Sequence, residues 1–338
     1  HSGYYATRAS AGAGRSGEVA GPLRSTAQAP SAPVGGHLPR NLHLRGYFRH
    51  VAACNSPLDE VFLPWLIDAQ VVGCIRPAFA RQLRRFADVF QFDDDEVRLD
   101  PGLRDFAARS AALEHVAREL AASEIITTFL GEPYAVTPGG RESAVCVVDR
   151  AAAAYFGVRS FGQHLNGYVR GADGIRMWVG RRARDRLLFP GALDNMVAGG
   201  LPHALTLEEN LVKESAEEAA VPERLARKAV PVGAISYNRI TQRGFRRDVL
   251  YCYDLEVPDD FVPCNMDGEV EEFMLLPLAE IAAIVRETDD FKLNCNLVVI
   301  DFLIRHGWLG PESPEYLALV TGLRNPLAAA DNLVSVGA

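Results

Sequence analysis

Hydrophobic and polar positions over residues 41–150 predict a mixture of short strands and helices. Residues 61–77 have the composition of two short strands joined at Asp68-Ala69-Gln70. Residues 102–123 form the clearest helical pattern, because Leu113, Val116 and Leu120 recur on one helical face. We therefore expect an N-terminal α+β domain over residues 41–150.

From residue 151 the pattern changes to strands with glycine-rich connections. Residues 162–171 and 174–184 predict a hairpin, and residues 228–240 and 245–258 predict a second antiparallel pair. Apolar residues recur at helical spacing in the segments 206–220, 278–287, 293–306 and 313–323. We expect an α/β domain with C-terminal helices over residues 151–325.

The two terminal segments differ from the rest of the chain. Residues 1–40 are rich in Ala, Gly, Ser and Pro and contain one acidic residue, Glu18, so they cannot bury enough apolar surface to fold. We expect a disordered tail, or a segment foreign to the natural chain; a transit peptide has a similar composition and is the alternative. Residues 326–338 are expected to be a second tail.

Composition and charge exclude several classes of protein. Hydrophobic residues make up 48% and charged residues 23% of the chain, as in soluble globular proteins. No apolar run reaches the ~18 residues of a membrane helix, and the net charge of −8, without a basic stripe, argues against nucleic-acid binding. Six cysteines without a CxxC pair predict free thiols in a reducing compartment. We expect a cytoplasmic protein, with organelle targeting through residues 1–40 as the alternative.

Three glutamates gather on the predicted helix over residues 206–220. Glu214, Glu217 and Glu218 are spaced i, i+3 and i+4, so they project from one side of the helix. A hard cation such as Mg²⁺ prefers oxygen ligands and would convert their repulsion into binding. Gly199 and Gly200 precede the helix and are expected to form a turn. The alternative is an ordinary solvated helix face.

The stretch from Gly199 to Val221 resembles the signature of Nudix hydrolases. In that signature, a Gly and a loop are followed by Arg-Glu-apolar-any-Glu-Glu-any-Gly-apolar on a helix. The resemblance places the family's metal-binding glutamates at Glu214, Glu217 and Glu218. It implies an α-β-α sandwich around a mixed sheet and hydrolysis of a diphosphate bond with Mg²⁺, or with Mn²⁺ as the second option.

The stretch departs from the family pattern at four positions. Leu205 stands in place of the first Glu and Lys213 in place of Arg, and Lys lacks the fork of donors that Arg offers. Ser215 replaces an apolar residue and Ala220 replaces the second Gly. These departures leave a second hypothesis open, namely a Nudix-fold module that binds a nucleotide or thiamin derivative without cleaving it.

A wider resemblance covers residues 41–325. It rests on five stretches, namely residues 161–169, 177–202, 209–219, 267–280 and 291–307. These stretches are similar to a subgroup related to thiamin pyrophosphokinase-like Nudix proteins, which have an extra N-terminal domain of uncharacterised role. The resemblance implies hydrolysis of thiamin diphosphate, or of its damaged analogues, to the monophosphate.

Further candidates for substrate contact lie on the predicted hairpin. His164, Asn166, Tyr168 and Arg170 share one strand face, and such a face suits stacking on a heteroaromatic ring and hydrogen bonding to its edge. A solvated sheet face is the alternative. Arginine suits phosphate oxygens, and the candidates on the next strand are Arg181 and Arg182.

The resemblance also bears on the general base and the partners. Nudix enzymes often take a further ligand or a base from outside the motif, so we expect Glu269, and after it Glu271, to assist the catalytic Glu217 and Glu218. Gly199 and Gly200 are expected to lie against the substrate. The expected partners are a small-molecule diphosphate and, as one option, a second copy of the chain in a homodimer.

Overall fold

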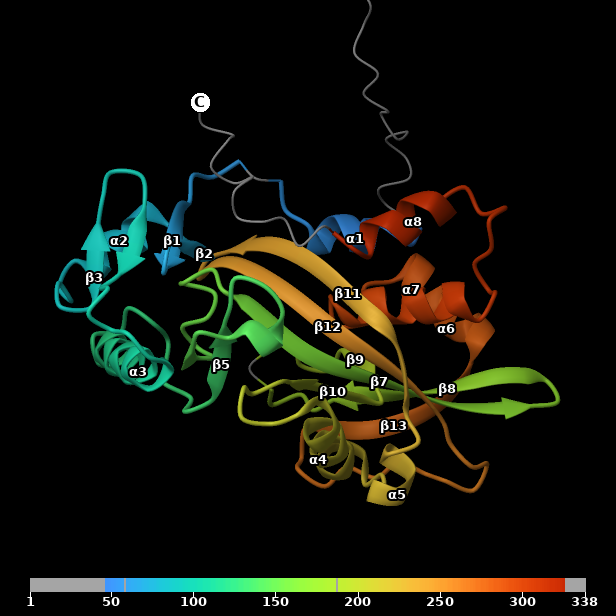
Figure 1. Ribbon diagram of the computed structural model, residues 1–338. Coiled ribbons are helices and arrows are strands. Elements are labelled where there is room, and N and C mark those ends of the chain that lie inside the picture. Colours follow the sequence, from blue (N-terminus) through green and yellow to red (C-terminus); the bar gives the residue numbers. More distant parts are fainter. Residues whose placement is uncertain (1–45, 58, 187, 326–338) are drawn as a thin grey trace, which may run out of the picture. The chain divides into compact units, whose positions relative to one another are not determined.

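The computed structural model describes residues 46–57, 59–186 and 188–325 (Figure 1). The predicted terminal segments 1–40 and 326–338 lie outside the described residues. Within the described part of the chain, no helix combines the length and the apolar character needed to cross a membrane. All six cysteines are free, as predicted.

The N-terminal region contains a four-stranded sheet of order β2-β1-β4-β3. The predicted turn between the first two strands is confirmed, with Asp68 and Ala69 in the left-handed region at φ 50° and 62°. This sheet packs on α2 and α3 around a core that includes Trp65 and Phe156. The elements are β1 (Leu63–Ile67), β2 (Gln70–Ile75), α2 (Pro77–Leu83), β3 (Phe90–Phe92), β4 (Val97–Leu99), α3 (Phe106–Ala122), and the paired β5 (Pro133–Val136) and β6 (Cys146–Asp149).

A larger mixed sheet of order β11-β12-β7-β8-β13 follows. Strand β12 runs parallel to β7, whereas the other pairs are antiparallel, and both predicted antiparallel pairs are present. Two short strands extend it, because β9 pairs with β8 and β10 pairs with β7. The strands are β7 (Arg159–Gly171), β8 (Gly174–Arg182), β9 (Leu193–Asn195), β10 (Val197–Gly200), β11 (Val230–Thr241), β12 (Gly244–Glu256) and β13 (Val270–Pro277).

Helices cover both faces of this sheet (Figure 1). Leu165 of β7 packs in one core with Leu211 of α4, whereas Tyr168 of β7 packs in another core with Phe302 of α7. The predicted α-β-α sandwich around a mixed sheet is therefore confirmed. One face holds α4 (Leu207–Ala219) and α5 (Glu223–Ala226), and the other holds α1 (Phe48–Cys54), α6 (Leu278–Glu287), α7 (Cys295–Arg305) and α8 (Tyr316–Gly322).

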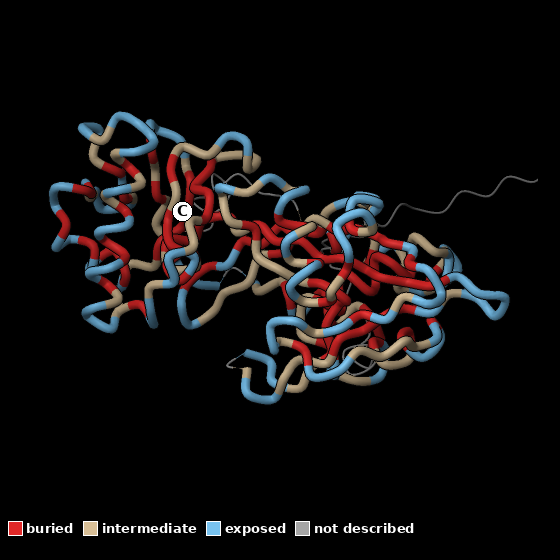
Figure 2. Tube along the Cα trace, turned by 90° about the horizontal axis from the view of Figure 1, so that it is seen from below, coloured by how far each residue is buried: buried red, intermediate tan, exposed pale blue. Residues whose placement is uncertain are grey.

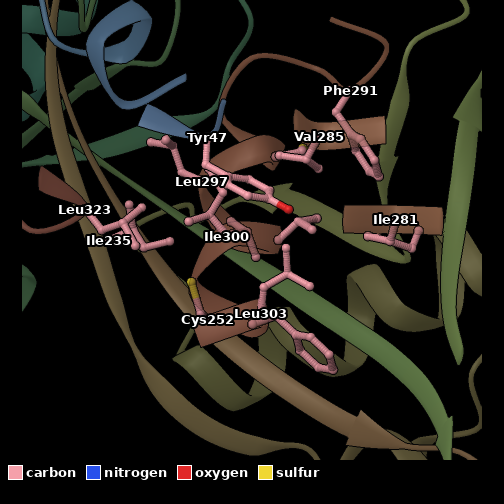
Figure 3. Packing of buried hydrophobic residues seen from close by; sticks show 14 of the residues in the cluster. Tyr47, Ile235, Cys252, Ile281, Val285, Phe291, Leu297, Ile300, Leu303 and Leu323 are labelled. Carbon is pink, nitrogen blue, oxygen red and sulfur yellow. The ribbon is translucent and has the colours of Figure 1, made fainter. Parts of the chain in front are cut away.

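The hydrophobic cores do not follow the bounds predicted for the N-terminal domain, residues 41–150. Tyr47 lies beside Leu297 and Ile300, so the segment around α1 belongs to the core under the C-terminal helices (Figure 3). The N-terminal core continues to Val158. Figure 2 shows buried residues along the central strands, while the tip of the β7–β8 hairpin is exposed. The division into two domains stays a prediction.

Candidate active site

Helix α4 begins at the predicted capping box. Thr206 Oγ1 accepts the backbone N–H of Glu209 at 3.2 Å, and the Glu209 carboxylate accepts the N–H of Thr206 at 2.8 Å. Leu211 is buried against the sheet, which fixes the rotation of the helix about its axis. Glu214 and Glu218, one and two turns further along, are consequently held next to strand β10.

Gly199 and Gly200 belong to strand β10 and pair with Gln163 and Gly162 of β7, so the predicted turn at these residues is wrong. Neither glycine has a positive φ. At both positions other side chains approach the backbone so closely that a larger residue would have to displace them. A Cβ atom at Gly199 would lie 2.5 Å from Oε2 of Glu214, and one at Gly200 would lie under 3.0 Å from the hydroxyl of Tyr134.

The carboxylates of Glu218 and Glu214 both lie against β10. Oε2 of Glu218 accepts the backbone N–H of Ala198 at 2.9 Å. Burial raises the pKa of Glu218 to about 8, and the charges of Asp194 and Glu214 add to the effect. Burial also raises the pKa of Glu214, against the opposing influence of Lys213. The site therefore holds excess negative charge when both groups are ionised.

Lys213 forms ion pairs with two of the three glutamates. Its Nζ lies 2.7 Å from Oε2 of the exposed Glu217 and 3.1 Å from Oε1 of Glu214. The three glutamates offer only oxygen donors, and two of them have raised pKa values, so their chemistry fits a hard divalent cation. In the described ranges they do not bring three donor atoms within 4.8 Å of one another.

Another cluster does meet that distance, and the sequence did not predict it. His164, Asp194 and Cys295 have donor atoms within 4.8 Å of one another and are all buried. The Cys295 thiol donates to Oδ1 of Asp194 at 2.7 Å, while Oδ2 of Asp194 accepts from Lys292 at 3.2 Å and from Arg182 at 3.1 Å. Two cations already balance the Asp194 carboxylate, so this cluster is a closed polar network.

The predicted ring-binding face of β7 is part of the same network. His164 Nδ1 bonds Asn195 Oδ1 at 2.8 Å, and Asn166 donates to Asp254 at 3.1 Å. The side chains of His164 and Asn166 are 3% and 0% exposed. Burial, together with the charge of Lys292, lowers the pKa of His164 to about 4, which keeps its ring neutral. Because α7 covers this face, both side chains lie in the interior, and their predicted contact with a substrate stays a prediction.

The remaining predicted contacts on this hairpin lie near acidic partners. Tyr168 donates its hydroxyl to Glu256 at 3.2 Å, and Arg170, which is half exposed, lies 3.8 Å from the same carboxylate. Arg181 pairs with Glu272 at 2.8 Å. Arg182 forms an ion pair with the buried Asp194. The roles of Tyr168, Arg170 and Arg181 toward a substrate stay predictions.

Glu269, the candidate base, lies directly before β13. Its carboxylate accepts from Arg186 at 2.6 Å, and its backbone carbonyl accepts the N–H of Ala183 at 2.9 Å. Its neighbour Glu271 pairs with Arg184 at 3.4 Å. Both carboxylates thus face the β8–β9 connection, and their contribution to proton transfer stays a prediction.

The N-terminal region reaches the motif at residues that the sequence did not single out. The N–H of His203 donates to the carbonyl of Pro133 at 2.8 Å. Arg141 donates to the carbonyls of Pro202 and His203 at 2.8 Å each, and also to that of Leu205. The loop between β10 and α4 is thus held from outside the motif. No local pattern could reveal contacts between segments some 60 residues apart.

One departure from the family pattern, Ala220, lies at the strained end of α4. Ala220 caps the helix with φ 52° and ψ 31°, a left-handed conformation in which glycine is favoured. We predict that Ala220→Gly raises the free energy of unfolding by about 0.5–1 kcal/mol, because the strain outweighs the added freedom of the unfolded chain. Urea unfolding measures the change. Ala216→Gly, within the same helix, is the matched control and should lower stability by about 1 kcal/mol; a loss of stability in both variants would contradict the prediction.

Two curated proteins of Arabidopsis thaliana align with most of the chain. Nudix hydrolase 24, chloroplastic, is 45% identical over 295 residues, which cover 86% of this chain and 80% of that protein. Nudix hydrolase 20, chloroplastic, is 43% identical over 293 residues, which cover 83% of this chain and 78% of that protein.

Two further comparisons concern parts of the chain. A family described as "Domain of unknown function (DUF4743)" matches residues 46–160. Among solved structures, the NUDIX domain of Shewanella oneidensis NrtR complexed with ADP ribose covers 44% of this chain and 90% of that one, at 15% identity and a TM-score of 0.36. The family assignment rests on the two plant relatives, whose identity extends over most of their length: the chain belongs to the Nudix hydrolase family.

Proposed function

We propose that this chain hydrolyses the diphosphate bond of a small organic diphosphate in a Mg²⁺-dependent reaction, with Mn²⁺ as an alternative metal. The observation that supports it best is the placement of Glu214 and Glu218 beside the glycine strand β10, at the positions of the Nudix motif. Thiamin diphosphate and its damaged analogues are the proposed substrates, and the monophosphate is the product.

Each glutamate has a distinct part in this proposal. Glu214, Glu217 and Glu218 would hold the metal, which when bound polarises phosphoryl oxygens and activates water. Ala198 orients Glu218 through its N–H, and α4 holds Glu214 against Gly199. Glu269, or a glutamate of the motif, would act as the general base toward water.

One observation favours a second candidate function. Lys213 pairs with Glu214 and Glu217 at once, which competes with a cation at the same carboxylates. A chain in which this competition prevails would bind a nucleotide or thiamin derivative without cleaving it.

A hydrolysis screen separates the two functions. Purified protein is incubated with Mg²⁺ or Mn²⁺ and four substrate classes, namely thiamin diphosphate with its oxidised analogues, nucleoside diphosphate sugars, dinucleotides and oxidised nucleoside triphosphates. We expect metal-dependent release of a monophosphate, greatest in the thiamin class. A rise in melting temperature with these ligands but no turnover would support the binding module instead.

The cellular destination is a further part of the proposal. Both plant relatives are named chloroplastic, which supports an organelle destination over the cytoplasmic one expected from the sequence. The segment that would carry such a signal, residues 1–40, lies outside the described residues.

A further inference from the structure

We propose that Arg150, from the region matched by the domain of unknown function, binds the diphosphate group of the substrate beside the glutamates of α4. This inference rests on the proposed function, because it assigns a further ligand-binding residue to the same site. It also gives the N-terminal region a part in the reaction, since Arg150 directly follows β6 of that region.

The position of Arg150 is set by the β5–β6 pair. Its backbone N–H donates to the carbonyl of Glu132 at 2.9 Å, and its Nη1 donates to the Glu132 carboxylate at 2.9 Å. Its guanidinium also lies over the ring of Tyr134, 5.8 Å from the centroid. The side chain is therefore anchored at its base and along its length before any ligand binds.

The anchored guanidinium lies at the glycine strand. A Cβ atom at Gly200 would be 3.6 Å from Cζ of Arg150, while a Cβ at the adjacent Gly199 would be 2.5 Å from Oε2 of Glu214. The arginine and the glutamate therefore lie against adjacent residues of β10, the arginine at Gly200 and the glutamate at Gly199.

Arg150 also has donors to offer a ligand. Guanidinium has five N–H donors in a planar fork that matches phosphate oxygens, and the bond to Glu132 engages Nη1. The side chain is 46% exposed. Arg150 can therefore present its remaining N–H donors to phosphate oxygens while it keeps the bond to Glu132.

The proposal accounts for a departure in the motif. The family pattern has Arg where this chain has Lys213, and Lys213 is engaged with Glu214 and Glu217. Arg150 would return a forked guanidinium to the site from another part of the chain.

The test compares Arg150→Gln and Arg150→Lys with wild type, using Arg118→Gln as the matched control. Arg118 lies in the same N-terminal region and forms an exposed pair with Glu114 at 2.7 Å. Inorganic pyrophosphate with Mg²⁺ is titrated calorimetrically, and KM and kcat are measured on the best substrate of the screen. Thermal unfolding of each variant reports whether the fold is retained.

We expect Arg150→Gln to weaken pyrophosphate binding roughly 10- to 100-fold and to raise KM more than it lowers kcat. Arg150→Lys should recover part of the loss, and Arg118→Gln should match wild type. Wild-type binding in Arg150→Gln would overturn the inference while leaving the proposed hydrolysis standing. Pyrophosphate binding that depends on Arg150, without hydrolysis of any substrate, would overturn the proposed hydrolysis alone. No pyrophosphate binding by the wild type would overturn the inference alone, because the hydrolysis screen tests the reaction separately.

Discussion

Replacing Glu218 by Gln is expected to abolish metal-dependent phosphate release while leaving the fold intact. The amide oxygen of Gln can still accept the N–H of Ala198, so the packing of α4 on β10 is retained. The charge that would face a cation is lost, however, and activity should fall by on the order of 10³-fold. Phosphate release measured across a Mg²⁺ titration checks the result. Full activity in this variant would remove Glu218 from the site.

A matched control and a second measurement separate this loss from a defect in folding. Glu208→Gln lies on the same helix, at an exposed carboxylate that pairs with Arg227, and should retain activity. Glu218 has a pKa raised to about 8 from an ordinary 4.5, so without metal the folded state binds more protons than the unfolded state between these values. The metal-free protein should therefore lose stability as the pH rises from 4.5 to 8, and this pH dependence should be weaker in Glu218→Gln.

Local patterns in the sequence predicted the elements around the site because their determinants are short-range. The capping box at Thr206 and Glu209 and the apolar Leu211 lie within one helix, so their spacing alone defines where α4 begins and which side it buries. The left-handed cap at Ala220 likewise explains why the family pattern favours glycine at that position.

The face of β7 could not be predicted in the same way. Alternation reports which side of a strand meets solvent, but β7 lies in the middle of a sandwich and is buried on both sides. His164 and Asn166 therefore had the pattern of a polar open face, although partners from β9 and β12 satisfy them in the interior. Those partners are 31 and 88 residues away along the chain, respectively, beyond any periodic signal.

The approach of Tyr134 and Arg150 to Gly200 could not be predicted from local patterns either. The sequence shows two glycines, and a turn is the commonest local reason for them. Here the reason is the close approach of side chains, one of them from a region that precedes the motif by more than 60 residues. The two glycines leave room for these side chains and do not bend the chain. Only the tertiary structure distinguishes the two roles.

The buried Asp194 network leads to the second large expected effect. Asp194→Ala should lower the free energy of unfolding by about 3–5 kcal/mol, because it leaves two cations, Lys292 and Arg182, without their shared carboxylate. The Asp194 side chain is 7% exposed, so water cannot replace the lost interaction. Urea unfolding at neutral pH measures the change, and Asp259→Ala, at a carboxylate that is 79% exposed, is the control with an expected loss below about 0.5 kcal/mol.

A double-mutant cycle with Lys292→Met tests whether charge balance is the cause. Lys292→Met alone leaves Asp194 paired with Arg182 at 3.1 Å and bonded by Cys295, so its cost should be smaller than that of Asp194→Ala. In the double variant the uncompensated charge of Lys292 is gone, and the loss should be less than the sum of the two single losses by about 1–3 kcal/mol. Additive losses would show that Asp194 contributes packing and hydrogen bonds alone. Coupling of the expected size would identify the network as an electrostatic link between β9 and the segment that directly precedes α7.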